Sequence, residues 1–317
     1  MTKTKTLHSF KADTIEEVEW DRPEMKDTQV EIKTLFCGVC RSDIGSYARW
    51  ELMPYASEFN PDGVLGTFGH EAVGIVTAVG AYVTKTKIGD YVATWSDPGY
   101  AETYYATEKE LTVIPEPDPK FILQPVACAL NILFKTINAK SDPDYEVLLV
   151  GTGFMSIIIG QYCKSNFIDL TVVGNSNRKI WEDLGYELQS MESIIDSDKK
   201  YTSIIDLSSK AENFDLITKH IAGLEAVICY ASTPTTPITT NFFENCWNCH
   251  TIIMPSPRNS DFDEVMEETR DAIINDEIDP SIIWSKEYDR HNIDEVKQAF
   301  EDGKHRPPGY LRGYLKF

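Results

Sequence analysis

A glycine turn between two apolar runs restricts the fold of this chain more than any other stretch. VLLV at 147–150 has the composition of a buried strand, GTGFMS at 151–156 follows it, and IIIGQYC at 157–163 continues as an apolar helix. The turn fits the G-x-G-x-x-small pattern, in which the first glycine permits a tight turn and the second admits a pyrophosphate. The helix N-terminus then offers N–H groups to phosphates. We therefore expect a dinucleotide to bind at Gly151, Gly153, Phe154 and Met155.

The sequence pattern changes at the proline-rich segment PEPDPK, residues 115–120. Before it, short β-type runs are punctuated by Gly, Asp and Pro, which predicts a β-rich domain. After it, the runs at 203–209 and 225–232 are continuous and apolar, as parallel strands buried on both faces are. Strands alternating with helices predict a doubly wound α/β domain, and a length of 317 residues suits two domains.

The residues after the second strand of the predicted α/β domain indicate whether NAD or NADP binds. NAD sites usually carry an Asp or Glu there to hold the ribose 2′-hydroxyl. This chain has GNSNRK at 174–179, in which Ser176, Arg178 and Lys179 would attract a 2′-phosphate. We expect NADP rather than NAD, and the alternative is a solvated polar loop.

A second group of functional side chains, which could bind a metal ion, lies between Cys37 and Glu71. Cys40 and His70 supply a thiol and an imidazole, and Asp43 and Glu71 supply carboxylates beside them. Such a set suits zinc, but a catalytic zinc needs three protein ligands and an open position. The third ligand must come from elsewhere in the fold.

Composition excludes several classes of protein. The formal net charge of -20 argues against nucleic acid or an anionic membrane as a partner. The N-terminus has no apolar signal-peptide core, and no uninterrupted run of about eighteen apolar residues predicts a membrane span. Seven cysteines in a chain of this size indicate reduced thiols. We expect a soluble, cytoplasmic protein that acts on a small molecule.

The motifs together, in their order, resemble the medium-chain dehydrogenase/reductase family, the zinc-dependent alcohol and polyol dehydrogenases. The resemblance covers nearly the whole chain and rests on CGVCRSD, GHEAVG, GDYV, GYAE, QPVACALN, VLLVGTGFM and GYLRG. It implies an α/β protein in which a GroES-like β-rich catalytic domain, residues 1–128 and 256–317, is interrupted by a Rossmann domain, residues 129–255. It also implies a homodimer or homotetramer.

The resemblance assigns roles to individual residues. Cys40 and His70 would be ligands of one catalytic zinc, with Glu71 near the metal as an occasional or outer ligand. Ser42 would relay the proton of the substrate alcohol, and Asp43 would orient His70. Two further residues, Arg41 and Arg312, would contact the cofactor pyrophosphate.

The third zinc ligand is where this chain departs from the family pattern. Polyol-type relatives carry Glu-Pro where this chain has Gln124-Pro125, and a neutral amide is a poor zinc ligand. Other relatives use a cysteine three residues after the proline, which is Cys128 here. We predict Cys128 because a thiolate suits zinc; Gln124 or water is the alternative. No cysteine lies between Tyr91 and Cys128, so we expect no structural zinc lobe.

The expected activity is hydride transfer between NAD(P) and an alcohol, polyol or aldehyde. The alternatives are a zinc-free quinone or enone reductase of the same superfamily and a non-catalytic nucleotide-binding protein. Cys246-Trp247-Asn248-Cys249-His250 matches the haem-attachment pattern, which we interpret as coincidence because nothing directs export. Trp50, Met53 and Tyr55 follow the predicted zinc loop and could equally line a pocket or pack.

Overall fold

The computed structural model describes residues 3–48, 68–139, 146–232, 237–240, 242–256 and 261–317. Trp50, Met53 and Tyr55 lie outside these residues. The chain forms two compact units. Unit 1 comprises Met1–Pro125, Met266–Ile273 and Pro280–Phe317, and unit 2 comprises Val126–Val265 and Ile274–Asp279.

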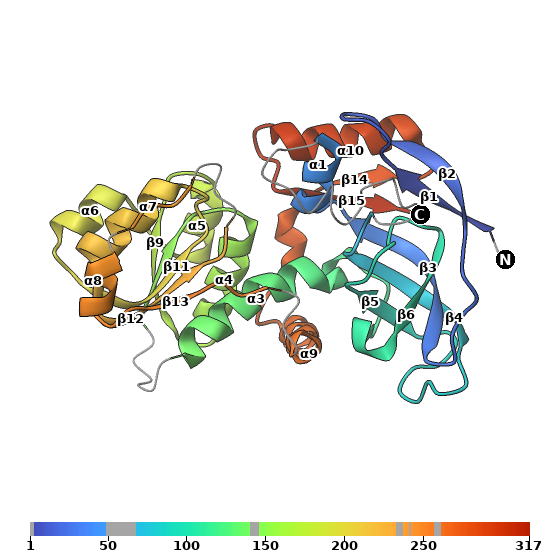
Figure 1. Cartoon of the computed structure of the whole chain (residues 1–317), viewed down its shortest axis with the longest axis horizontal. Coiled ribbons are helices and arrows are strands. Elements are labelled where there is room, and N and C mark those ends of the chain that lie inside the picture. Colours follow the sequence, from blue (N-terminus) through green and yellow to red (C-terminus); the bar gives the residue numbers. More distant parts are fainter. Residues whose placement is uncertain (1–2, 49–67, 140–145, 233–236, 241, 257–260) are drawn as a thin grey trace. The chain divides into compact units, whose positions relative to one another are not determined.

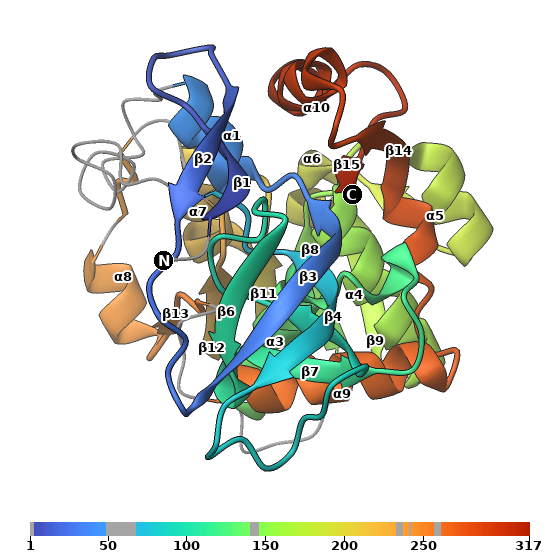
Figure 2. The same ribbon diagram turned by 90° about the vertical axis from the view of Figure 1, so that its right-hand side faces the viewer.

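Unit 1 is built mainly of strands. Within its described residues, the main sheet has the order β14-β15-β3-β4-β5-β7, β6 pairs with β3, and β1 pairs with β2 in a separate sheet (Figure 2). The bounds are β1 (Lys3–His8), β2 (Glu16–Asp21), β3 (Gln29–Gly38), β4 (Ala72–Val79), β5 (Tyr91–Thr94), β6 (Thr103–Thr107), β7 (Leu111–Ile114), β14 (Trp284–Asp289) and β15 (Arg312–Lys316).

Strand β3 is the centre of this sheet because its alternating sequence buries one face. Val30, Ile32 and Thr34 are buried, whereas Lys33 between them is exposed, as the two-residue period of a strand requires. Its long antiparallel pairing with β4 runs from Val30↔Val79 to Cys37↔Ala72. The end of β3 therefore lies beside the start of β4.

Two helices complete the described part of this unit, and both pack through aromatic residues. Helix α1 (Arg41–Ala48) follows β3 directly, and α10 (Ile293–His305) lies beside it in Figure 1. The Tyr47 and Phe300 rings are 5.1 Å apart between centroids and are both buried. This contact joins the N-terminal part of the chain to its C-terminal part.

Unit 2 is a parallel sheet with helices on both sides (Figure 1). Its described strands are β8 (Glu146–Val150), β9 (Asp169–Val173), β10 (Leu188–Gln189), β11 (Tyr201–Asp206), β12 (Ala222–Tyr230) and β13 (Thr251–Ile253). Its helices are α4 (Phe154–Ser165), α5 (Arg178–Leu184), α6 (Met191–Asp196), α7 (Ala211–Leu216) and α8 (Phe242–Trp247). Two more helices cross the division between the units, α3 (Leu123–Asn138) and α9 (Phe262–Ile274).

The strand order β10-β9-β8-β11-β12-β13 confirms the predicted doubly wound fold. The order reverses between β8 and β11, and ligands of such sheets bind at the carboxyl ends of the strands at this point. Both neighbours of β8 run parallel to it, and Val147–Val150 are buried. The structure thus has the expected class, a β-rich unit with an inserted Rossmann-like unit. Within the described residues, none of the helices has the length and apolar character to cross a bilayer.

The contact between α4 and α5 depends on a glycine. A Cβ on Gly160 would lie 2.6 Å from a ring carbon of Trp181, which is fully buried. We expect Gly160→Ala to destabilise the protein by up to about 2 kcal/mol, because overpacking against a fully buried ring costs up to about 3 kcal/mol and the helix gains about 1 kcal/mol from Ala. Thermal and urea unfolding measure this change.

Gly153→Ala is the matched control. A Cβ there meets nothing within 4 Å, so this variant should unfold like the parent. Equal stability of the parent and Gly160→Ala would contradict the packing argument.

Candidate metal and cofactor sites

Three segments meet at the end of β3 because of strand pairing. Gly38 N donates to Glu71 O over 2.9 Å on one side, and Val39 N donates to Gly313 O over 3.0 Å on the other. The first pairing continues the β3–β4 ladder and the second continues the β15–β3 ladder, in which Tyr314 opposes Gly38. Cys40, Glu71 and Arg312 are thereby brought together from positions far apart in the sequence.

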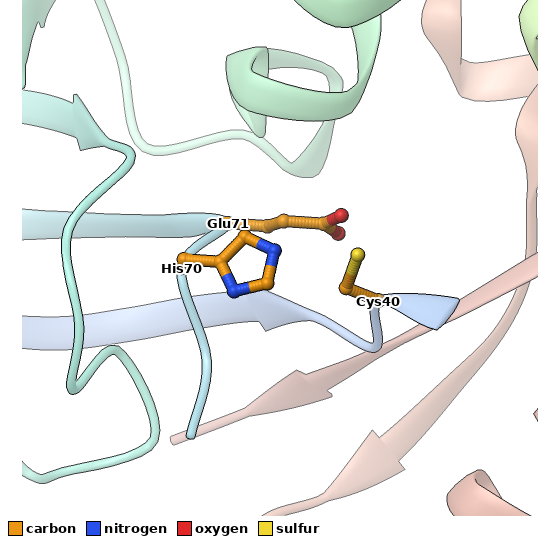
Figure 3. A group of neighbouring side chains, drawn as sticks. All are labelled: Cys40, His70 and Glu71. Atoms are coloured by element: carbon orange, nitrogen blue, oxygen red, sulfur yellow. The ribbon is translucent and has the colours of Figure 1, made fainter. Parts of the chain in front are cut away.

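Cys40, His70 and Glu71 form a group with the geometry of a metal site. One potential ligand atom from each lies within 4.8 Å of the others. Figure 3 shows Cys40 projecting from the segment after β3 and the other two side chains from the segment leading into β4. Thiolate, imidazole and carboxylate are all ligands that zinc accepts.

Glu71 is the most deeply buried member of this group. Its side chain is 1% exposed, and its Oε2 accepts a hydrogen bond from Arg312 Nη2 over 2.5 Å. Gly38 makes room for it, because a Cβ at that position would lie 2.2 Å from Glu71 Oε2. Oε1 is buried and has no hydrogen-bond partner among the described residues. A buried carboxylate oxygen without a partner is costly unless a cation or donor binds it.

His70 is held between carboxylates. Its Nδ1 lies 3.8 Å from Asp43 Oδ1 and 3.8 Å from Asp97 Oδ1, which leaves Nε2 on the side of Ser42 and Cys40. Burial opposes protonation of the ring, but the nearby Cys40 and Asp43 outweigh it and hold the pKa of His70 well above its usual range. The surroundings of His70 therefore favour positive charge, as the neighbourhood of a bound cation should.

Asp43 is a buried carboxylate fixed by two hydrogen bonds. Tyr100 Oη donates to Oδ2 over 3.0 Å, and Gly69 N donates to Oδ1 over 3.5 Å. Burial raises the pKa of Asp43, while His70 and these hydrogen bonds oppose that rise. Tyr100 also donates to Gly38 O over 3.1 Å, so one tyrosine ties Asp43 to the end of β3.

Tyr100 was missed by the sequence analysis. It lies in the GYAE run that carried part of the resemblance, yet a tyrosine in a strand-rich segment gives no sign of its partner. Only its complete burial next to another buried polar group identifies it as a positioning residue.

Ser42 lies in the first turn of α1 against both predicted ligands. Its Oγ is 3.2 Å from Cys40 Sγ and 3.4 Å from His70 Nε2. This position agrees with a hydroxyl that serves a substrate oxygen at the same site.

Cys128 and Gln124 both lie on α3, but Cys128 belongs to unit 2 and Gln124 to unit 1. Gln124 is 5% exposed and Cys128 is partly buried. Cys128 as a third ligand stays a prediction. Within unit 1 the structure brings a different third group, Glu71, to Cys40 and His70.

The glycine turn of unit 2 has the geometry of a phosphate-binding turn. Gly151 adopts φ +121°, a conformation that favours glycine, and a Cβ there would meet the Leu207 backbone at 3.2 Å. Gly153 begins α4 in open space, since a Cβ would meet nothing within 4 Å. Ser156, the third small position, is buried against the sheet. The N-terminus of α4, where Phe154 and Met155 lie, is thus accessible to an anion.

The loop after β9 is tied to this turn. Thr152 Oγ1 and Ser176 Oγ are 2.6 Å apart, and Asn177 Nδ2 donates to Thr152 O over 2.8 Å. Arg178 is exposed at the start of α5, whereas Lys179 pairs with Asp183 one turn further along the helix. Of the two cations predicted to bind a 2′-phosphate, Arg178 is therefore the better placed.

The two arginines predicted at the pyrophosphate are both in unit 1. Arg41 is the first residue of α1, and Arg312 begins β15 with its guanidinium buried beside Glu71. Arg312 Nη2 also donates to Val39 O over 3.3 Å. Arg312 thus holds the Glu71 side chain beside the end of β3.

Comparison with known proteins agrees with this geometry. Residues 26–116 match the model of the alcohol dehydrogenase GroES-like domain. An alcohol dehydrogenase of Geobacillus stearothermophilus is 27% identical over 219 residues, which are 59% of this chain and 62% of the relative. The comparisons confirm the predicted resemblance to the alcohol dehydrogenase-like proteins of the medium-chain dehydrogenase/reductase family. An 8-hydroxygeraniol dehydrogenase of Catharanthus roseus is 26% identical over 199 residues, which are 49% of this chain and 51% of the relative. The chain thus spans about three fifths of the first relative and about half of the second.

Solved structures share the fold over the whole chain. A protein described as a short chain alcohol dehydrogenase, from Escherichia coli CFT073 in complex with NADH, has a TM-score of 0.80 at 18% identity and covers 100% of both chains. A protein of Sinorhizobium meliloti 1021 bound to NADP, described as a zinc-binding dehydrogenase, has a TM-score of 0.75 at 15% identity with the same coverage. At these identities the likeness establishes the fold alone.

The buried pair between Glu71 and Arg312 generates a stability prediction. Arg312→Met should destabilise the metal-free protein by about 3–5 kcal/mol, because it leaves the Glu71 charge buried without its partner. Urea unfolding in the presence of a chelator measures the loss.

The double variant Glu71→Gln with Arg312→Met should recover much of that stability, since it removes both charges. A loss below about 1 kcal/mol for Arg312→Met would mean that the pair behaves like an exposed one.

Proposed function

We propose that the protein is a zinc-dependent oxidoreductase that transfers a hydride between NAD(P) and an alcohol, polyol or aldehyde. The observation that carries the proposal is the convergence of Cys40, His70 and Glu71 with a buried Glu71 oxygen that lacks a hydrogen bond. A zinc-free reductase has no need for this combination of thiol, imidazole and carboxylate.

The donor set fits zinc on chemical grounds. Cys40 and His70 would hold the ion, with Glu71 Oε1 or the predicted Cys128 as third ligand. Asp43, fixed by Tyr100, would keep the His70 ring in place from the Nδ1 side, as the outer partners of ligand imidazoles do. When bound, zinc supplies Lewis acidity towards the substrate oxygen.

The remaining chemistry is assigned to residues of this chain. Ser42 would accept the proton of the substrate hydroxyl and pass it towards solvent, since its Oγ lies against both ligands. Arg41 and Arg312 would contact the cofactor pyrophosphate, and the turn at Gly151 and Gly153 would offer backbone N–H groups to the dinucleotide phosphates. When bound, the nicotinamide would supply the acceptor for the hydride of the substrate carbon in the oxidative direction.

NADP is proposed over NAD because of the residues at the end of β9. That strand is followed by Gly174 and Asn175 and carries no acid at its end. The Ser176 hydroxyl lies beside Thr152 of the glycine turn, and the exposed Arg178 begins α5 two residues later. A guanidinium there would bind a 2′-phosphate by charge-assisted hydrogen bonds. A cytoplasmic location and a dimeric or tetrameric state remain predictions.

Metal content tests the proposal first. We expect about one zinc per chain in protein purified without chelator, and replacement of Cys40 or His70 by Ala should remove the zinc and all alcohol turnover. Catalytic zinc loses its site when one of its few ligands is deleted. Plasma emission spectrometry on the purified variants measures the content.

Two further variants distinguish the third ligand. Loss of zinc in Cys128→Ala alone would assign it to Cys128, and loss in Glu71→Gln alone would assign it to Glu71. A parent without zinc, or normal turnover in Cys40→Ala, would refute the zinc mechanism.

Cofactor choice gives a separate prediction. Arg178→Gln should raise the Kd for NADPH about tenfold and leave the Kd for NADH within about twofold, because one charge-assisted hydrogen bond contributes about 1.5–3 kcal/mol. Nucleotide fluorescence titration measures both constants.

Lys164→Gln, an equal loss of charge on α4, is the control and should change neither constant. Tighter binding of NADH than NADPH by the parent would overturn the choice of NADP.

A further inference from the structure

We infer that Arg306 joins Arg41 and Arg312 to form a three-guanidinium site in unit 1 for a phosphate group. The inference adds a residue that the sequence analysis did not consider, and it deepens the proposed function by naming the ligand chemistry at this site. All three arginines belong to unit 1, so their grouping is a property of that unit alone.

The backbone brings Arg306 to this place. Helix α10 ends at His305, and Arg306 adopts the left-handed conformation with φ +48°. Its N–H donates to Asp302 O over 2.7 Å, which closes the helix. The chain therefore turns at Arg306 and leaves the helix axis towards the segment that leads into β15, where Arg312 lies.

The last turn of α10 packs on the helix that Arg41 begins. A Cβ on Gly303 would lie 2.4 Å from Ile44 Cδ1, so the two helices touch at this glycine. Gly303 is three residues before Arg306, and Ile44 is three residues after Arg41, about one helical turn in each case. The first turn of α1 and the last turn of α10 are thus adjacent.

Electrostatics supports the same grouping. Although Arg306 is exposed overall, nearby groups partly desolvate its guanidinium, which lowers its pKa. The positive charges of Arg41 and Arg312 lower the pKa of Arg306 further, and Tyr310 opposes this. This repulsion agrees with the packing of α10 on α1, which brings Arg306 towards the start of α1, where Arg41 lies.

The neighbouring cations have carboxylate partners, but Arg306 does not. Lys304 pairs with Asp13 at 2.6 Å and His305 with Glu301 at 3.1 Å, while Arg312 pairs with Glu71. Within the described part of the chain no carboxylate lies within ion-pair distance of Arg306. This is notable in a chain with a net charge of -20, where carboxylates are abundant. An anion that binds here would relieve the repulsion.

A phosphate group suits such a site better than a carboxylate. It presents several charged oxygens in different directions, and planar guanidinium forks from three segments can each bind a different oxygen. The phosphate could belong to the dinucleotide or to a phosphorylated substrate. Both sources share this chemistry, and binding measurements separate them.

The test compares Arg306→Gln with the parent by calorimetry, using inorganic pyrophosphate, NADH, NADPH and glycerol 3-phosphate. We expect an approximately tenfold weaker Kd for pyrophosphate, because a charge-assisted contact is lost. A parallel loss for NADH and NADPH identifies the dinucleotide as the source. A loss for glycerol 3-phosphate with unchanged dinucleotide binding identifies the substrate. Arg306→Lys should recover part of the affinity.

Lys297→Gln is the matched control, since Lys297 lies on the exposed face of the same helix and its loss changes the net charge equally. Unchanged binding of all four ligands by Arg306→Gln would overturn the inference, whether or not the variant unfolds earlier, because Arg306 would then only cap α10. An equal effect of Lys297→Gln would overturn it as well. Pyrophosphate binding needs neither zinc nor turnover, so this result is independent of the dehydrogenase proposal.

Discussion

The candidate site depends on the pairing of β3 with β4 on one side and β15 on the other. The last residues of β3 donate hydrogen bonds to Glu71 O and Gly313 O, so the segments after β3, before β4 and before β15 must meet. Cys40, Glu71 and Arg312 owe their proximity to these backbone bonds. A shift of one residue in either ladder would turn the side chains to the other face and dissolve the group.

Charge is the second organising principle of this site. Glu71 and Arg312 are both buried, and a buried pair is stable only while both members are present. The pair leaves one carboxylate oxygen of Glu71 without a partner, next to a thiol and an imidazole whose surroundings favour positive charge. The same residues that close the end of β3 therefore also present a site suited to a dication. The groups that stabilise the end of β3 are thus the same groups to which the proposed catalytic roles are assigned.

In unit 2, the strand order of the sheet determines where the predicted cofactor-binding residues lie. In a doubly wound sheet, the order of parallel strands brings the turn after the first strand to the point where the order reverses. Gly151 and Gly153 lie there, and hydrogen bonds from Asn177 and between Thr152 and Ser176 hold the next loop against the turn. The position of Arg178 follows from this local network. The cofactor choice proposed for this protein thus rests on contacts within a few residues of the glycine turn.

The sequence by itself determined the fold class and the glycine turn, and it indicated Cys40 and His70 as candidate metal ligands, because periodicity, turn residues and ligand types are local properties. It gave Glu71 as an occasional or outer zinc ligand and did not indicate Tyr100 or Arg306. Their positions depend on the strand register, the burial of Asp43 and the packing of α10 on α1. These contacts join residues that are distant in the sequence: Tyr100 and Asp43 are 57 residues apart, and Arg312 and Glu71 are 241 residues apart. Such pairings depend on which surfaces bury each other, and only the tertiary structure decided them, because no local pattern records a distant partner.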